Sequence, residues 1–194
     1  MYKGVFKILS SYWRAYGGWR ALWRSPYWHA AILMTVLSFP MWRTGSAWWD
    51  LVIGVMPNLL GFTLGGFAIF IGFGDEKFRT ILIEETERDV REGRVSIYEE
   101  LCATFVHFIV VQILALAFAL LQKAWSMEVI ANATWQGMLP TLNLVGGFAG
   151  YLLFLYAVCL TLAACMHVFR FAKDYSTVVN FEVRRKVREQ QQRP

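Results

Sequence analysis

The sequence has few charged residues for its length. Only 17% of its 194 residues are Asp, Glu, Lys or Arg, whereas 57% are hydrophobic. A soluble domain of this size covers its core with a charged surface, so the composition argues against a soluble protein. The charges occur in clusters, separated by uncharged runs long enough to cross a bilayer. We therefore expect a single all-α integral membrane domain.

Other absences narrow the function. Cysteine is scarce and odd in number, and Cys102, Cys159 and Cys165 have no metal-site spacing, so we interpret them as packing residues in a reducing compartment. The sequence has no phosphate-binding glycine loop, nucleophile elbow, HExxH motif or pair of carboxylates inside an uncharged run. No cleavable signal is visible at the start. We expect no catalytic residues, no metal and no cofactor.

Four uncharged runs are candidate transmembrane helices, at residues 26–42, 51–74, 101–121 and 142–169. The first run is the shortest, because 18 uncharged residues separate Arg24 from Arg43. As a helix they span about 27 Å, just below a hydrocarbon core of about 30 Å. With four crossings, 17 of the 19 Lys and Arg residues lie on one side, and only Arg43 and Lys123 lie on the other. The positive-inside rule then puts both termini in the cytoplasm.

The segments outside these runs are expected to be helical extensions. Residues 1–25 read as an amphipathic helix in the lipid interface, broken at Gly17-Gly18; the alternative is a helix packed on the protein's own cytoplasmic loop. Residues 75–100 read as a charged cytoplasmic linker helix, with a capping box at Ser96 and Glu99 that starts the third span. Residues 170–194 read as a basic cytoplasmic tail. The residues expected at the membrane interface are Trp13, Trp19, Trp23, Trp48, Trp49, Arg184, Arg185 and Lys186.

Small residues form a stripe along the second run. It consists of Gly54, Asn58, Gly61, Gly65, Ala68 and Gly72, which share one face of a helix at about 100° per residue. The fourth run has a shorter pair, Gly146 and Gly150. Such faces let helices approach closely in lipid, within one copy or between copies.

A second interpretation of the stripe is that it surrounds the axis of a pore. Pro57 leaves the Ile53 carbonyl without its helical donor, and this carbonyl then needs protein or water rather than lipid. The candidate pore-lining residues are Asn58, Phe62, Thr63, Ile69 and Phe73.

The remaining polar residues of the spans give weaker signals. We expect Gln112 to make an interhelical hydrogen bond, and His29, His107 and His167 to lie near the interface, where a histidine can reach water. No carboxylate lies in the middle of a run, which argues against a proton-coupled or cation-coupled transporter.

The layout resembles small four-span bacterial membrane proteins, including the membrane subunits of some anti-phage systems. Residues 57–62, Pro-Asn-Leu-Leu-Gly-Phe, are similar to the pore helix of bestrophin-type anion channels. The leading hypothesis is a homo-oligomeric, pore-like assembly in the bacterial inner membrane, with the second span near the axis. The alternative is a membrane anchor or sensor that recruits a cytoplasmic effector through residues 75–100 or the tail. The expected partners are lipid, further copies and this effector. Nucleic acid is not expected, because the basic residues flank spans.

Overall fold

The protein is helical throughout the part that the structure describes. The computed structural model describes residues 2–43, 47–72, 80, 96–126 and 139–191, and no strand occurs among them. Its helices are α1 (Tyr2–Tyr16), α2 (Gly18–Arg24), α3 (Pro26–Leu37), α4 (Phe39–Trp42), α5 (Trp48–Gly72), α8 (Ile97–Ser126) and α9 (Leu139–Gln191). The expected all-α class is confirmed for these residues.

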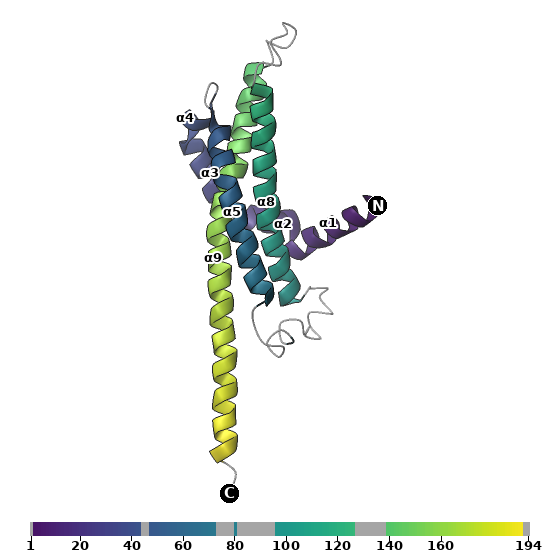
Figure 1. Ribbon diagram of the computed structural model, residues 1–194, viewed down its shortest axis with the longest axis vertical. Coiled ribbons are helices and arrows are strands. Elements are labelled where there is room, and N and C mark those ends of the chain that lie inside the picture. Colours follow the sequence, from purple (N-terminus) through teal and green to yellow (C-terminus); the bar gives the residue numbers. More distant parts are fainter. Residues whose placement is uncertain (1, 44–46, 73–79, 81–95, 127–138, 192–194) are drawn as a thin grey trace.

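Three helices run side by side as a bundle, α5, α8 and α9 (Figure 1). Segments Trp48–Gly72, Ile97–Ala124 and Asn143–Arg185 are each long and apolar enough to cross a membrane. They contain the third predicted run, the second run except its last two residues, which lie outside the described part, and the fourth run except Leu142. The structure thus supports a membrane-embedded protein with at least these three candidate spans.

The first predicted run does not form one helix. It divides into α3, of 12 residues, and α4, of 4 residues, with the break at Ser38. The Trp42 indole bridges the break by donating a hydrogen bond of 2.7 Å to the Thr35 carbonyl. Both short helices lie against α9, through edge-on ring contacts of Trp28 with Tyr156 and of Trp42 with Phe148. A crossing at residues 26–42 is therefore not established by helix length.

Two predicted helix boundaries are confirmed. The backbone N–H of Glu99 donates to the Ser96 hydroxyl at 3.2 Å, which satisfies a free donor at the start of α8. Gly17 and Gly18 have φ values of 96° and 63°. This left-handed backbone suits glycine and ends α1 before α2 begins.

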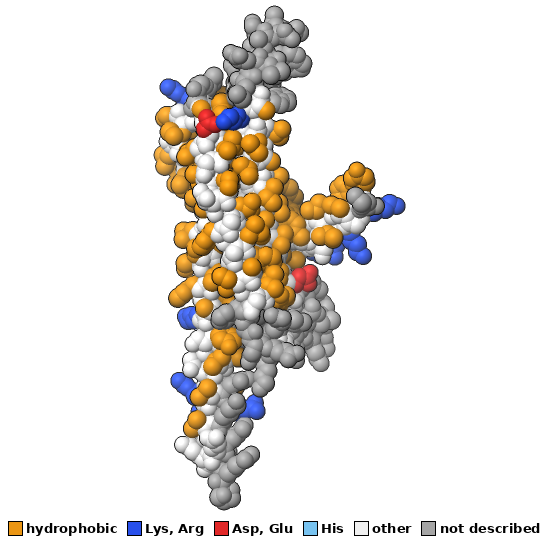
Figure 2. Space-filling view, viewed as in Figure 1, with side chains coloured by type: hydrophobic (Ala, Val, Ile, Leu, Met, Phe, Trp, Pro, Cys, Tyr) orange, Lys and Arg blue, Asp and Glu red, His pale blue; other side chains and the backbone are white. Residues whose placement is uncertain are grey.

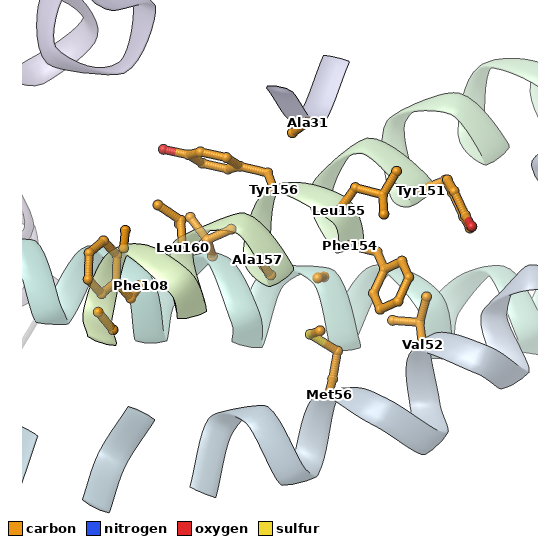
Figure 3. Close-up of a cluster of buried hydrophobic side chains, with 14 of the residues drawn as sticks. Ala31, Val52, Met56, Phe108, Tyr151, Phe154, Leu155, Tyr156, Ala157 and Leu160 are labelled. Carbon is orange, nitrogen blue, oxygen red and sulfur yellow. The ribbon is translucent and has the colours of Figure 1, made fainter. Parts of the chain in front are cut away.

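The core lies where α3, α5, α8 and α9 meet. Figure 3 shows Val52 and Met56 of α5 pointing toward α9, with Val52 beside Phe154. Alanines keep the helix axes close, because a methyl side chain takes little space. The fully buried ones are Ala31, Ala115, Ala119 and Ala157.

The basic tail predicted at 170–194 continues the fourth span without a break. Helix α9 has 53 residues and extends well past the bundle (Figure 1). Arg184 follows Phe169, the last residue of the predicted fourth run, by 15 positions, or about 22 Å of helix. The headgroup contacts predicted for Arg184 and Arg185 stay a prediction. The Lys186 side chain lies outside the described residues, as do Phe73 and most of the 75–100 linker.

Candidate functional site

The glycine stripe of α5 is an exposed face of the protein. All six stripe residues are exposed. A Cβ atom added at Gly54, Gly61, Gly65 or Gly72 would meet nothing within 4 Å. Among the 18 most apolar consecutive residues of each helix, 17% are buried in α5, compared with 39% in α8 and 39% in α9. The described part of the chain therefore leaves this face uncovered.

A polar position interrupts this face halfway along the helix. Pro57 and Asn58 are both exposed, and Pro57 has no N–H to give to the Ile53 carbonyl. Asn58 makes no hydrogen bond within the described residues. Polar groups inside an apolar helix need protein or water as partners, since lipid tails offer none.

The other predicted pore-lining residues divide into two groups. Phe62 is 56% exposed and Ile69 is 66% exposed, and both lie within about 40° of Asn58 around the helix. They share the uncovered side of α5. Thr63 does not, because five positions of 100° each place it about 140° from Asn58.

Thr63 instead belongs to a buried polar link, so its predicted pore-lining role is wrong. Its hydroxyl donates to the Leu59 carbonyl at 2.9 Å and accepts from Nε2 of Gln112 at 2.9 Å. The same Gln112 nitrogen lies 3.4 Å from the hydroxyl of Thr161. The interhelical hydrogen bond predicted for Gln112 is confirmed, and it joins α8 to both α5 and α9.

The glycine pair of α9 has close neighbours within the chain. A Cβ atom at Gly150 would overlap the rings of Trp48 and Phe118, and one at Gly146 would lie 3.0 Å from Oε1 of Gln122. Gly146 and Gly150 thus serve contacts inside one copy. Trp48 is only 4% exposed, because its ring packs over Gly150. Its predicted place at the level of the lipid interface stays a prediction.

A second cluster, which the sequence pattern does not predict, joins α1 to the bundle. The Tyr12 hydroxyl lies 2.8 Å from Nδ1 of His107, and Nε2 of His107 lies 3.1 Å from the Tyr156 hydroxyl. Tyr16 stacks on the His107 ring at a centroid distance of 3.8 Å and lies 3.5 Å, oxygen to oxygen, from Tyr156. We call these four residues the tyrosine–histidine cluster.

This cluster corrects the expectation that His107 reaches water. His107 is 4% exposed, because α1 covers it. Neutral imidazole has one donor and one acceptor nitrogen, and a tyrosine hydroxyl can serve as either, so both ring nitrogens can be satisfied. Burial, and secondarily the neighbouring Tyr16, raise the pKa of Tyr12 to about 12. The Tyr12 hydroxyl therefore stays protonated near neutral pH and can donate.

The other candidate interface and metal residues are dispersed. Trp19 and Trp23 are 66% and 59% exposed, Trp49 is partly buried, and the Trp13 ring lies edge-on to Trp19. His29 is exposed and hydrogen-bonds the Ser25 carbonyl. Among the residues that the structure describes, no three His, Cys, Asp or Glu side chains gather in a way that could hold a metal ion.

Two features thus stand out: the uncovered glycine face of α5 and the tyrosine–histidine cluster that holds α1. The first is an exposed side of an apolar helix, and the second is a set of buried contacts between α1, α8 and α9. No family model, curated protein or solved structure matches the chain.

Proposed function

We propose that the protein is a non-enzymatic membrane protein that assembles into a homo-oligomer through the glycine face of α5. The observation that carries the proposal is that this face is open along its whole length. Lipid provides no hydrophobic drive for helices to associate, so close van der Waals contact between small residues has to provide it. We expect a second copy of the protein to cover this face, because its own α5 presents the same row of small residues and allows close packing.

We further propose that the oligomer is pore-like, with α5 nearest the axis. Asn58 and the carbonyl of Ile53 would then meet water or the same groups of other copies, which satisfies them where lipid would not. Phe62 and Ile69 lie on the same side and would form apolar constrictions. Such constrictions gate by dewetting.

The proposed topology has four crossings with both termini in the cytoplasm of a bacterial cell. The α3–α4 segment would supply the first crossing, since it runs along α9 from Tyr156 to Gly147. Its two helices have 16 residues, or about 24 Å, and a bilayer can thin locally to match a short span. Helix α1 would lie at the inner surface.

Reconstitution tests the oligomer and the pore separately. The oligomer is counted by single-molecule photobleaching in liposomes, and conductance is recorded in planar bilayers. We expect Gly61→Leu with Gly65→Leu to abolish both, because leucine side chains keep the backbones apart. Ala117→Leu is the matched control, since Ala117 is exposed on α8, and should change neither.

Asn58→Leu separates the two parts of the proposal. It should leave the oligomer intact and lower the conductance. A wild-type protein that is monomeric in liposomes would reject the oligomer. A wild-type oligomer without conductance would reject the pore.

A second candidate function is a membrane anchor or sensor for a cytoplasmic effector, as in an anti-phage system. The observation that favours it is the extension of α9 past the bundle. Phe181 and Val183 are 70% and 54% exposed there, beside Arg184 and Arg185. Pull-down of cytoplasmic proteins with α9 truncated after Asp174, and with 75–95 deleted, tests it. Unchanged recovery by both variants would reject these segments as docking sites.

A further inference from the structure

We infer that α1 is an arm that binds the anionic lipid surface of the inner leaflet. Its apolar side enters the boundary of the acyl chains, and Lys3, Lys7 and Arg14 contact the headgroups. The inference rests on the proposed topology in one respect, that α1 faces the cytoplasmic leaflet.

The first observation is that α1 has an uncovered apolar side. Val5, Phe6, Ile8 and Leu9 are 53%, 71%, 71% and 46% exposed. Contiguous exposed apolar side chains of this size mark a surface that contacts lipid or another molecule. Around the helix, the three basic residues lie on the opposite side, at about 100° per residue.

The second observation is which end of the bundle the apolar side and the basic side of α1 each face. Helix α1 projects sideways from the bundle, across the direction of α5, α8 and α9 (Figure 1). Hydrophobic side chains lie along its upper side, toward the end where α5 begins, and Lys and Arg lie along its lower side and at its tip (Figure 2). The lower side faces the end from which α9 extends. An interfacial helix needs this arrangement, with its apolar side toward the hydrocarbon.

The third observation is the level at which α1 is attached. Tyr12 contacts His107, and sixteen positions of α8 separate His107 from Lys123 at the opposite end. These positions rise about 24 Å, close to the hydrocarbon thickness of about 30 Å. The tyrosine–histidine cluster therefore holds α1 near one boundary of the hydrocarbon while Lys123 lies at the other.

The positive charge of α1 and α2 indicates which lipid headgroups α1 binds. Helices α1 and α2 contain five basic residues, and no Asp or Glu occurs before Asp50. None of the five forms an ion pair within the described residues. Each Lys or Arg near an anionic leaflet strengthens binding by about fivefold. A zwitterionic surface offers no such gain, so anionic headgroups are the ligand that fits.

The test places a nitroxide label on either side of α1 in the full-length protein, with Cys102, Cys159 and Cys165 replaced by alanine. Phe6→Cys reports the apolar side and Ser11→Cys the polar side. Single copies in nanodiscs are compared in phosphatidylcholine and in a phosphatidylcholine–phosphatidylglycerol mixture. The readout is collision of the label with oxygen, which enters lipid, or with a nickel chelate, which stays in water.

We expect oxygen to dominate at Phe6→Cys and the nickel chelate to dominate at Ser11→Cys. The anionic mixture should lower nickel collisions at Phe6→Cys severalfold. Lys3→Gln, Lys7→Gln and Arg14→Gln together should remove that response, whereas Arg184→Gln with Arg185→Gln, the matched control on α9, should not. Equal collision rates at both label positions, or a response retained without the three charges, would overturn the inference.

This test is independent of the proposed oligomer and pore. Nanodiscs hold one copy, so failure of the oligomer or pore would not alter the label result. If the alanine background does not fold, trypsin cleavage of the wild-type protein at Lys7 replaces the labels. Phosphatidylglycerol should slow cleavage at Lys7 relative to cleavage at Arg185; equal slowing at both sites would contradict the proposed binding.

Discussion

The Tyr12 hydroxyl lies 2.8 Å from Nδ1 of His107, which joins residues 95 positions apart in the chain. Tyr12 belongs to a helix outside the bundle, and His107 is a residue of α8 that is only 4% exposed. The contact fixes the position of α1 along the long axis of the bundle. It therefore connects the proposed lipid-binding arm to the helix that packs against α5.

Removal of this contact should loosen α1 without unfolding the bundle. Tyr12→Phe deletes one hydroxyl and leaves a ring nitrogen of His107 unpaired, at a cost of about 1–3 kcal/mol. We expect faster amide hydrogen exchange in residues 2–16 and unchanged exchange in α5. A double-mutant cycle with His107→Leu checks the pairing: additive effects would show that the two side chains do not interact.

Alkaline pH should have a similar effect. The pKa of Tyr12 is about 12 in the folded protein, against 10.0 for an ordinary tyrosine. The fold thus favours the protonated hydroxyl, and this contribution is complete below pH 10 and lost as the pH rises from 10 toward 12. Exchange in residues 2–16 should accelerate over that window. In Tyr12→Phe the acceleration should be smaller; an equal change in both proteins would assign it to another group.

The two kinds of glycine should respond oppositely to alanine. Gly150→Ala forces a methyl group into the rings of Trp48 and Phe118, and overpacking of this kind costs about 1–3 kcal/mol. Gly54→Ala meets open space in one copy and gains helix propensity. Thermal unfolding of the monomer in detergent should show a lower Tm for Gly150→Ala only. A comparable loss for Gly54→Ala would show that a part of the chain covers that face.

The Gln112 link should contribute little stability. Interhelical hydrogen bonds within membranes average about 0.6 kcal/mol, and the Gln112 Oε1 atom is buried without a partner in the described residues. Gln112→Leu removes both the bond and this unpaired oxygen. We expect its free energy of unfolding in detergent to change by less than about 1 kcal/mol. A larger loss would mean that the link organises the three helices.

The sequence sufficed for features that depend on local chemistry. Hydrocarbon-length runs predicted α5, α8 and α9, Gly17-Gly18 predicted the break after α1, and Ser96 predicted the start of α8. Each of these depends on the apolar length of one segment or on a few adjacent residues, which can be read from the chain directly.

Features that depend on packing were not predictable in this way. Small residues at 54–72 and at 146 and 150 look alike in sequence, yet one set is exposed and the other lies against Trp48, Phe118 and Gln122. A small side chain does not show which helix, if any, approaches it. The same limit explains Thr63, whose partner Gln112 lies 49 positions away.

The tyrosine–histidine cluster is only partly predictable from the sequence. Tyr12 and Tyr16 are one helical turn apart on the apolar side of α1, and this pattern predicts a contact with lipid as readily as one with protein. The position of His107 in the third run predicts that its side chain lies near water. Its burial depends on where α1 folds back, and that is a tertiary contact.

Cysteine cross-linking in native membranes tests the central claim, that the glycine face of α5 meets another copy. Ala68 lies on this face and Ala117 on α8, and both are exposed alanines, so Ala68→Cys and Ala117→Cys in the cysteine-free background form a matched pair. We predict that oxidation produces cross-linked dimers from Ala68→Cys and none from Ala117→Cys. Cross-linking at Ala117→Cys alone, or at neither position, would contradict the claim.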